Sequence, residues 1–297
     1  MFCRDEYASQ SLGAKGLANI PDEQKFQTAV LAIEAGLAAA RKGQFEKALN
    51  TFSRSIESDP DRWESYRFRG ITHVKLGQHD LAIADLGAAI QRNPECAECF
   101  YERATAKMLA GQPRTALEDL SRCLSLNVHF APAYSTRAGI YTRMGLYRQA
   151  LEDIDVAVKL KRGNAGYLHN RAVILTAMDR WGEAVENYEQ AIKLDPSGGG
   201  TYNNLAWLHA TAKDPAFRNC RKAVFYCRKA LEIGKNASWL DTLAAAYAEC
   251  GDFEKALEIA TQAYKLSRPP NENFRQRIEI YRLGKTYSDW RAENSKN

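Results

Sequence analysis

The sequence predicts an all-α superhelical solenoid of seven helix-turn-helix repeats, closed by a C-terminal capping helix. Three observations carry this prediction. An alanine recurs every 34 residues, a second small residue recurs at the same interval, and glycine and proline stand at fixed places between them. A unit of two helices cannot bury its own apolar face, so successive units must stack on one another.

Two registers of small residues define the helices of each unit. The second helix carries an alanine at Ala48, Ala82, Ala116, Ala150 and Ala184. The first helix carries a small residue at Gly36, Gly70, Ala104, Ala138, Ala172 and Ala206. Small side chains at both places let the two helices of one unit approach closely, with apolar residues at helical spacing on either side.

Helix-ending residues separate the registers. A glycine lies five positions before each of the first four alanines, at Gly43, Gly77, Gly111 and Gly145, and Asp179 stands there in the fifth unit. Glycine accepts the left-handed conformation that ends a helix. Proline cannot continue a helix, and it follows the second helix at Pro60, Pro94 and Pro196.

These units resemble the tetratricopeptide-repeat (TPR) family, whose pattern is W-x2-L-G-x2-Y, then A-x3-F, then P. Phe52 and Pro60 follow Ala48 in this pattern, and Tyr188 and Pro196 follow Ala184. The resemblance covers roughly residues 29–268. In the sixth unit the second helix comes five residues late, after a longer turn that contains Pro215, a variant similar to that of bacterial multi-repeat TPR proteins.

The two ends lie outside the period. Residues 1–28 are predicted to form an N-terminal extension, and residues 269–297 a capping helix with a polar tail. The capping helix is expected from about Glu272 to Leu283, and the tail from Ser288 on is expected to fray. Its apolar stripe is Phe274, Ile278 and Tyr281, and the residues expected to face water are Arg275, Arg277, Glu279 and Arg282.

Composition excludes several classes of function. Lys and Arg exceed Asp and Glu by 41 − 36 = 5, too small a surplus to indicate nucleic acid or a membrane surface. No apolar run is long enough for membrane insertion, and the first 30 residues contain no signal sequence. The seven cysteines follow no framework, which favours free thiols in a reducing compartment. We therefore expect a cytoplasmic protein, although an exported chain whose signal has been removed would look the same.

No catalytic, cofactor or metal motif is present, so the sequence does not predict an enzyme. Cys96 and Cys99 form a CxxC pair at a predicted helix start. One interpretation is a redox pair or half of a metal site. The other, favoured because no second CxxC occurs, is two small apolar fillers at a helix junction.

The TPR resemblance implies where a ligand would bind. In that family the first helix of each pair lines a concave groove, through the second, fifth, ninth, twelfth and thirteenth positions of each unit. Carried over residue by residue, the candidate groove residues are Arg67, Ile71, Val74, Lys75, Tyr101, Met108, Arg143, His169, Asn203 and Trp207. The same register continues through Thr211, Asp241 and Glu249. We call the surface formed by these inward positions the inner face.

Two features of this face favour a ligand. An apolar patch would lie where water should be, formed by Ile71, Val74, Tyr101, Met108 and Leu109. Asn203, one turn before Trp207, suits the clamping of an extended backbone. The alternative is that these residues only pack against neighbouring first helices. His169 could either contact a ligand or remain solvated.

The predicted function is an interaction scaffold that binds a peptide or protein surface in the groove. A structural component that self-associates through its ends or convex face, as a homo-oligomer, is a second possibility, and an accessory subunit of an enzyme encoded elsewhere is a third. The first repeat would also expose an apolar stripe at Val30, Ile33, Leu37 and Ala40, which residues 1–28 or a partner are predicted to cover.

Overall fold

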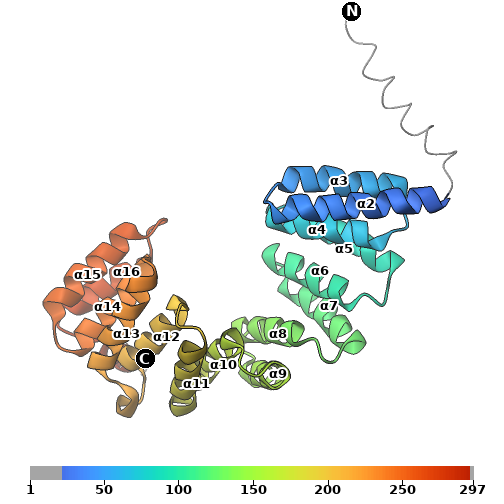
Figure 1. Cartoon of the computed structure of the whole chain (residues 1–297). Helices are drawn as coiled ribbons and strands as arrows, with labels where there is room; N and C mark the ends of the chain where they lie inside the picture. The colour runs from blue at the N-terminus through green and yellow to red at the C-terminus, as the bar shows by residue number, and fades with distance from the viewer. Residues whose placement is uncertain (1–21, 295–297) are drawn as a thin grey trace, which may run out of the picture. The chain divides into compact units, whose positions relative to one another are not determined.

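The computed structural model describes residues 22–294, and every regular element in that span is a helix. The chain divides into two compact units, one ending at Ala133 and the other beginning at Tyr134 (Figure 1). Both are built from pairs of helices that pack against each other and against the next pair. The predicted all-α helix-turn-helix solenoid is confirmed.

From Asp22 on, the first unit contains three helix pairs. They are α2 (Asp22–Arg41) with α3 (Phe45–Ser58), α4 (Trp63–Lys75) with α5 (His79–Arg92), and α6 (Ala97–Leu109) with α7 (Pro113–Leu126). Helix α2 begins within the residues assigned to the N-terminal extension. Residues 1–21 lie outside the described residues, so their docking on the first repeat stays a prediction.

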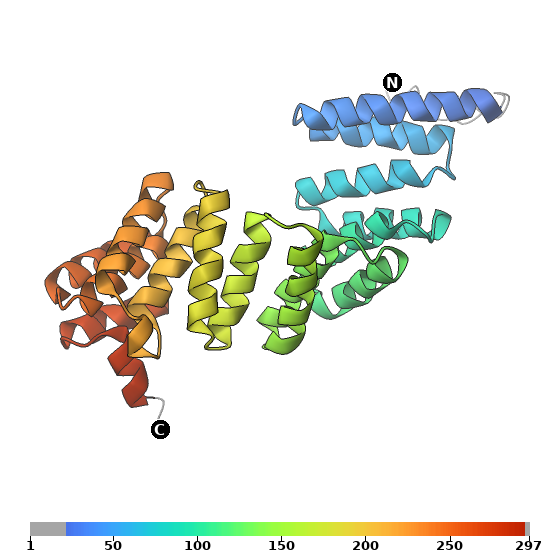
Figure 2. The same ribbon diagram turned by 60° about the horizontal axis from the view of Figure 1, so that its bottom comes forward.

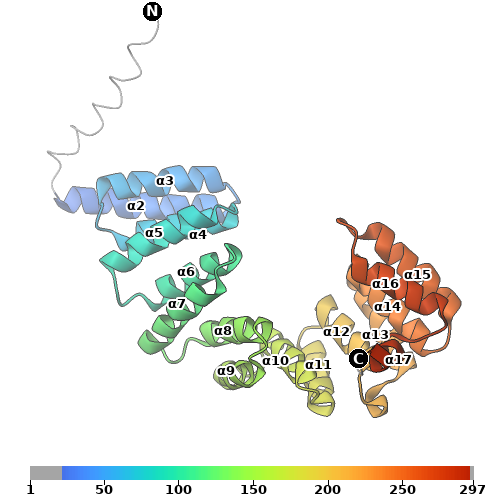
Figure 3. The ribbon, with the colours of Figure 1, turned by 180° about the vertical axis from the view of Figure 1, so that it is seen from behind.

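The second unit contains four pairs and two further helices, and its successive pairs stand side by side in Figure 2. The pairs are α8 (Ala131–Arg143) with α9 (Tyr147–Leu160), α10 (Ala165–Ala177) with α11 (Trp181–Leu194), α12 (Gly199–Thr211) with α13 (Cys220–Ile233), and α14 (Ala237–Glu249) with α15 (Phe253–Leu266). The long turn predicted in the sixth repeat contains the short 3-10 helix η2 (Pro215–Phe217). After α15 come α16 (Glu272–Arg282) and α17 (Tyr287–Asn294), which lies against α12, α14 and α16 (Figure 3).

The alanine register forms the contact between the two helices of each pair. Its members are all fully buried: Ala48, Ala82, Ala116, Ala150, Ala184, Ala223 and Ala256. On the facing helix even a methyl group would not fit in places. A Cβ at Gly70 would lie 2.8 Å from Cγ of Leu86, and one at Gly36 would lie 2.5 Å from the ring of Phe52. The close approach of the facing helix therefore limits these positions to small residues.

The turns after the first helices take the left-handed conformation that the sequence predicts. Gly77 has φ +72°, and Asp179, which replaces glycine in the fifth repeat, has φ +58°. A left-handed conformation is unfavourable for a residue with a side chain, although Asp tolerates it better than most. The Asp179 carboxylate pairs with Lys213 of the next repeat at 2.8 Å.

An ion pair recurs within the repeats, and the sequence analysis did not predict it. An arginine on the first helix of a pair bonds an aspartate 16 residues later on the second, in Arg69–Asp85, Arg103–Asp119 and Arg137–Asp153. All three aspartates are buried, so each needs a partner of opposite charge. In the fifth repeat the register holds Asn187, and Arg171 bonds Asp155 instead, at 2.6 Å.

We expect Gly70→Ala to lower the free energy of unfolding by about 1 kcal/mol or more, because the added methyl group overlaps Leu86. The matched control is Gly87→Ala, also in the second repeat, where the nearest atom to a new Cβ is the Arg103 guanidinium at 3.7 Å. That change should raise stability by roughly 0.5–1 kcal/mol, since alanine favours a helix over glycine. Guanidinium unfolding followed by circular dichroism measures both, and equal effects of the two substitutions would contradict the close-approach account.

Candidate functional site

The inner face of the first unit is crossed by an ion pair between neighbouring first helices. Arg67 on α4 donates two hydrogen bonds to Glu102 on α6, from Nε at 2.7 Å and from Nη2 at 2.6 Å. Both side chains are partly buried. Burial raises the pKa of the Glu102 carboxyl, and the Arg67 guanidinium opposes that shift. Arg67 therefore already has a partner within the chain.

The other candidate residues of this unit surround the pair with partly accessible apolar groups. Ile71, Val74, Tyr101 and Met108 are each half-buried, and Lys75 is exposed. The Tyr101 ring lies against Phe130 with centroids 5.1 Å apart, and Val74 packs on the core around Leu86. Leu109, which follows Met108 in the inward register, is 55% exposed. Packing within the chain therefore leaves part of each of these side chains accessible.

In the second unit, the candidates on α8 and α10 differ in their surroundings. Arg143 is exposed. His169 shares a hydrogen bond of 3.0 Å with Thr201 of α12 and lies edge-on to the ring of Tyr188. Desolvation lowers the pKa of His169, which favours the neutral ring. His169 is therefore partly buried and links two neighbouring first helices.

Helix α12 brings Asn203 and Trp207 together one turn apart, as predicted from their spacing. Asn203 is half-buried, yet its Oδ1 atom is buried and has no hydrogen-bond partner. Buried amide oxygens are nearly always paired, so an unpaired one is noteworthy. The Trp207 ring, in contrast, is covered by the chain's own C-terminal helices. It lies 5.6 Å from the ring of Tyr287 and 5.4 Å from the Arg277 guanidinium.

The capping helix α16 docks as predicted through Phe274, Ile278 and Tyr281, but one of its charged residues turns inward. The expectation that Arg277 faces water is wrong, because it is only 9% exposed. It donates two hydrogen bonds to the buried carboxylate of Asp241 on α14, the one from Nε at 2.6 Å. Arg277 points inward because Asp241 is a carboxylate at an inward position of the last repeat, and a buried carboxylate requires a cation.

The tail is helical as far as Asn294, contrary to the expectation that it frays from Ser288 on. Residues 287–294 form α17, whose Ser288 donates a hydrogen bond of 3.2 Å to Glu249. Arg291 Nη2 donates to the backbone oxygen of Thr211 at 2.8 Å. Trp207, Thr211, Asp241 and Glu249 all belong to the inward register, so α16 and α17 occupy the inner face of the last two repeats.

Four of the six cysteines in the described part of the chain are paired, which corrects the expectation of free thiols. Cys96 and Cys99 form a disulfide at the start of α6, where both are buried. Cys220 at the start of α13 is joined to Cys250 at the end of α14. Cys123 and Cys227 are buried thiols, and burial raises the pKa of Cys123 to about 11. The two free thiols are therefore unreactive packing residues.

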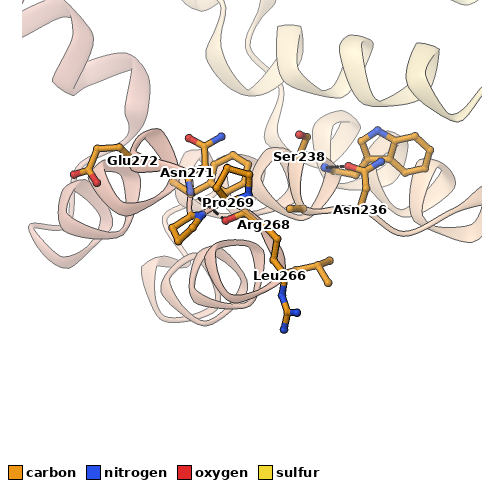
Figure 4. Close-up of a pocket in the computed structure, with 12 residues that line it drawn as sticks. Asn236, Ser238, Leu266, Arg268, Pro269, Asn271 and Glu272 are labelled. Carbon is orange, nitrogen blue, oxygen red and sulfur yellow. Dashed lines mark hydrogen bonds between the residues drawn. The ribbon is translucent and has the colours of Figure 1, made fainter. Parts of the chain in front are cut away.

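The second unit has two hollows that could hold a small ligand. The larger, about 770 Å³, lies between the start of α14 and the loop from α15 to α16 (Figure 4). Asn236 and Asn271 line it, and each caps a helix by accepting a backbone hydrogen bond. The smaller, about 220 Å³, lies between α10, α12 and α17 and is lined in part by Trp181, Trp207 and Arg291. Within residues 22–294 no group of three or more acidic, histidine or cysteine side chains could hold a metal ion.

Stacked helix pairs joined by left-handed turns place the chain among helical-repeat solenoid proteins. The tetratricopeptide-repeat family model matches residues 33–95 and 69–127, and a second model of that family matches residues 165–197. Over residues 33–127 and 165–197 the chain therefore consists of tetratricopeptide repeats. Proteins of this family bind protein or peptide partners, and the repeats support an interaction scaffold in general terms.

Similar solved structures agree with this assignment. A tetratricopeptide-repeat protein from Parabacteroides merdae matches with a TM-score of 0.65 at 15% identity, over 86% of this chain and 99% of its own. The pilF protein of Pseudomonas aeruginosa matches with a TM-score of 0.63 at 17% identity, over 75% and 97%. A MamA structure matches with a TM-score of 0.51 at 22% identity, over 57% and 93%. At these identities the likeness concerns the fold alone.

None of the curated proteins has a matching sequence. In the described part of the chain, no helix is both long enough and apolar enough to cross a bilayer.

Removing Asp241 should destabilise the second unit strongly, because Arg277 would be left buried without a counter-charge. We expect Asp241→Ala to cost about 3–5 kcal/mol, whereas the double change Asp241→Leu with Arg277→Met should recover most of that loss. As a control, breaking the exposed pair Arg282–Glu279 should cost no more than about 1 kcal/mol. Urea unfolding curves of the wild type, Asp241→Ala, the double variant and the control give the four free energies of unfolding. A small loss of stability in Asp241→Ala would mean that the pair is not buried.

Reduction should lower the stability of the last two repeats. The Cys220–Cys250 bond closes a loop of 30 residues, and the chain-entropy model assigns such a crosslink roughly 3–4 kcal/mol. Melting curves with and without dithiothreitol should therefore differ for the oxidised wild type. Cys220→Ser should melt alike under both conditions apart from the small contribution of the Cys96–Cys99 pair. Identical wild-type curves would show that this disulfide does not stabilise the fold.

Proposed function

We propose that this chain is a protein-interaction scaffold, rather than an enzyme, that holds a peptide or protein surface along the inner faces of its repeats. The observation that carries the proposal is the accessible apolar surface of the first unit. Ile71, Tyr101, Met108 and Leu109 stay half-buried or exposed at inward positions, while the core is built from the alanine register. Burying such side chains on a partner contributes about 25 cal/mol per Å² of apolar area.

Charge supports a protein ligand over a nucleic acid. The Arg67 guanidinium is neutralised by Glu102 on the same face, and Glu98, also at an inward position, adds negative charge near it. A phosphate backbone requires a run of unpaired cations, which this face does not offer. A ligand here would instead place apolar side chains over Tyr101 and Met108 and polar backbone groups near the ion pair.

The second unit offers a polar anchor. The Oδ1 atom of Asn203 is buried and has no hydrogen-bond partner, so it can accept a hydrogen bond from a bound segment once it is uncovered. Trp207, one turn away, is covered by Tyr287 and Arg277. An amide beside an aromatic ring is a common arrangement for holding a peptide. We therefore propose Asn203, Trp207 and His169 as the ligand contacts of this unit when the C-terminal helices no longer cover Trp207.

The test of the first-unit face starts from an identified partner, found by affinity purification and mass spectrometry, and titrates it by calorimetry. Tyr101→Ala and Met108→Ala should each weaken binding by more than about 1 kcal/mol, a factor of five or more, if they are anchors. Leu81→Ala is the matched control, since Leu81 is 53% exposed but lies on a second helix, α5. Equal affinity of all three variants would exclude the inner face of the first unit as the binding surface.

Self-association is the second candidate, because α2 has apolar residues in contact with solvent. Phe26 and Leu31 on α2 are 51% and 56% exposed. Exposed apolar groups of this kind often mark an interface. A role as an accessory subunit and a cytoplasmic location also remain proposals, the latter depending on whether the disulfides form in the cell.

A further inference from the structure

The C-terminal helix α17 lies where a ligand of the second unit would bind. Three of its contacts with the repeats end on inward positions: Tyr287 on Trp207, Arg291 on the carbonyl of Thr211, and Ser288 on Glu249. Trp290 adds an apolar contact with the core around α14 and α16. The chain thus already presents a helix to its own inner face.

The two C-terminal helices differ in how firmly they are held. Helix α16 buries Phe274, Ile278 and Tyr281 and is locked by the Arg277–Asp241 pair. Helix α17 has eight residues, and its aromatic side chains are only partly buried. A helix this short is not stable alone in water, so docking alone keeps it folded. It is attached through Gly284, whose φ of +68° leaves the helical region, next to the 71% exposed Leu283.

The chemistry of the docked helix defines what this face recognises. Tyr287 and Arg291 are four residues apart, so they lie on the same side of α17. The Tyr287 ring covers Trp207. The Arg291 guanidinium bonds the carbonyl of Thr211 at the C-terminal end of α12, where carbonyl groups lack helical partners and the helix dipole attracts a cation. An aromatic residue followed four positions later by an arginine thus matches two fixed features of α12.

We propose that the inner face of α12 and α14 binds a short amphipathic helix that carries this aromatic and arginine pair, and that α17 is the chain's own copy of that ligand. This rests on the proposed scaffold function. A partner helix with the same pattern displaces α17, while α16 stays docked and keeps the last repeat capped. The segment from Gly284 to Asn294 covers the inner face of α12 and α14 when no partner is bound.

Tethering makes the competition measurable. A segment held by a short linker acts at an effective concentration on the order of millimolar. A free helix that binds the open face with a Kd of about 100 μM should therefore bind the closed chain roughly tenfold more weakly. Removing the α17 contacts should restore the tighter binding without any change in the face itself.

The experiment uses a fluorescein-labelled synthetic peptide of residues 284–294 and the full chain. The double variant Tyr287→Ala with Arg291→Ala removes both anchors of α17, and Ser288→Glu opens the face differently, by setting a carboxylate against Glu249. Both opened chains should bind the peptide at least tenfold more tightly than wild type in fluorescence polarisation. Trp207→Ala in the double variant, or Arg291→Ala in the peptide, should abolish the gain.

Arg282→Ala is the matched control, since it removes an exposed arginine from α16 and should bind the peptide like wild type. Hydrogen exchange should speed up in α17 of the opened chains while α16 stays protected, which shows that the cap remains folded. Equal binding by closed and opened chains, or no binding to either opened chain at about 1 mM peptide, would overturn the proposal. Partner capture through Tyr101 is measured on the other unit, so a failure there is distinguishable from a failure here.

Discussion

The close contact between the two helices of each repeat is the constraint on which the rest of this structure depends. It requires a small residue wherever the backbones meet, and a Cβ at Gly70 would already overlap Leu86. In most repeats a tight turn joins the two helices, with a residue such as Gly77 in the left-handed conformation. The same spacing brings a first-helix arginine within reach of the aspartate 16 residues later, as in Arg69–Asp85.

Those buried ion pairs show how charge is distributed between the interior and the inner face. Asp85, Asp119 and Asp153 are compensated inside their own repeats, so the first helices keep their remaining positions for contacts elsewhere. In the second unit a different solution occurs at the end of the repeats. Asp241 lies on the inner face, and its partner Arg277 comes from the capping helix. The cap is therefore held by charge as well as by its apolar stripe.

The two units consequently present different inner faces. In the first, Tyr101 and Met108 stay partly accessible beside an internally neutralised ion pair. In the second, Trp207 is covered by Tyr287 and Arg277. One scaffold can in this way combine an open surface with one that its own C-terminal helix covers. Helix α17 is held on this face by only a few contacts, so it is easier to displace than α16.

The sequence by itself determined the 34-residue period, the helix pairs, the turn positions including Asp179, and the apolar stripe of α16, because each follows from spacing within one or two helices. Tertiary structure alone decided that Arg277 pairs with Asp241, 36 residues away, that Cys220 meets Cys250, and that α17 docks. These contacts depend on how one repeat is rotated on the next and on the lengthened turn of the sixth repeat. A polar helix has the same residue pattern whether it docks through a few side chains or remains in water, so local periodicity does not distinguish the two.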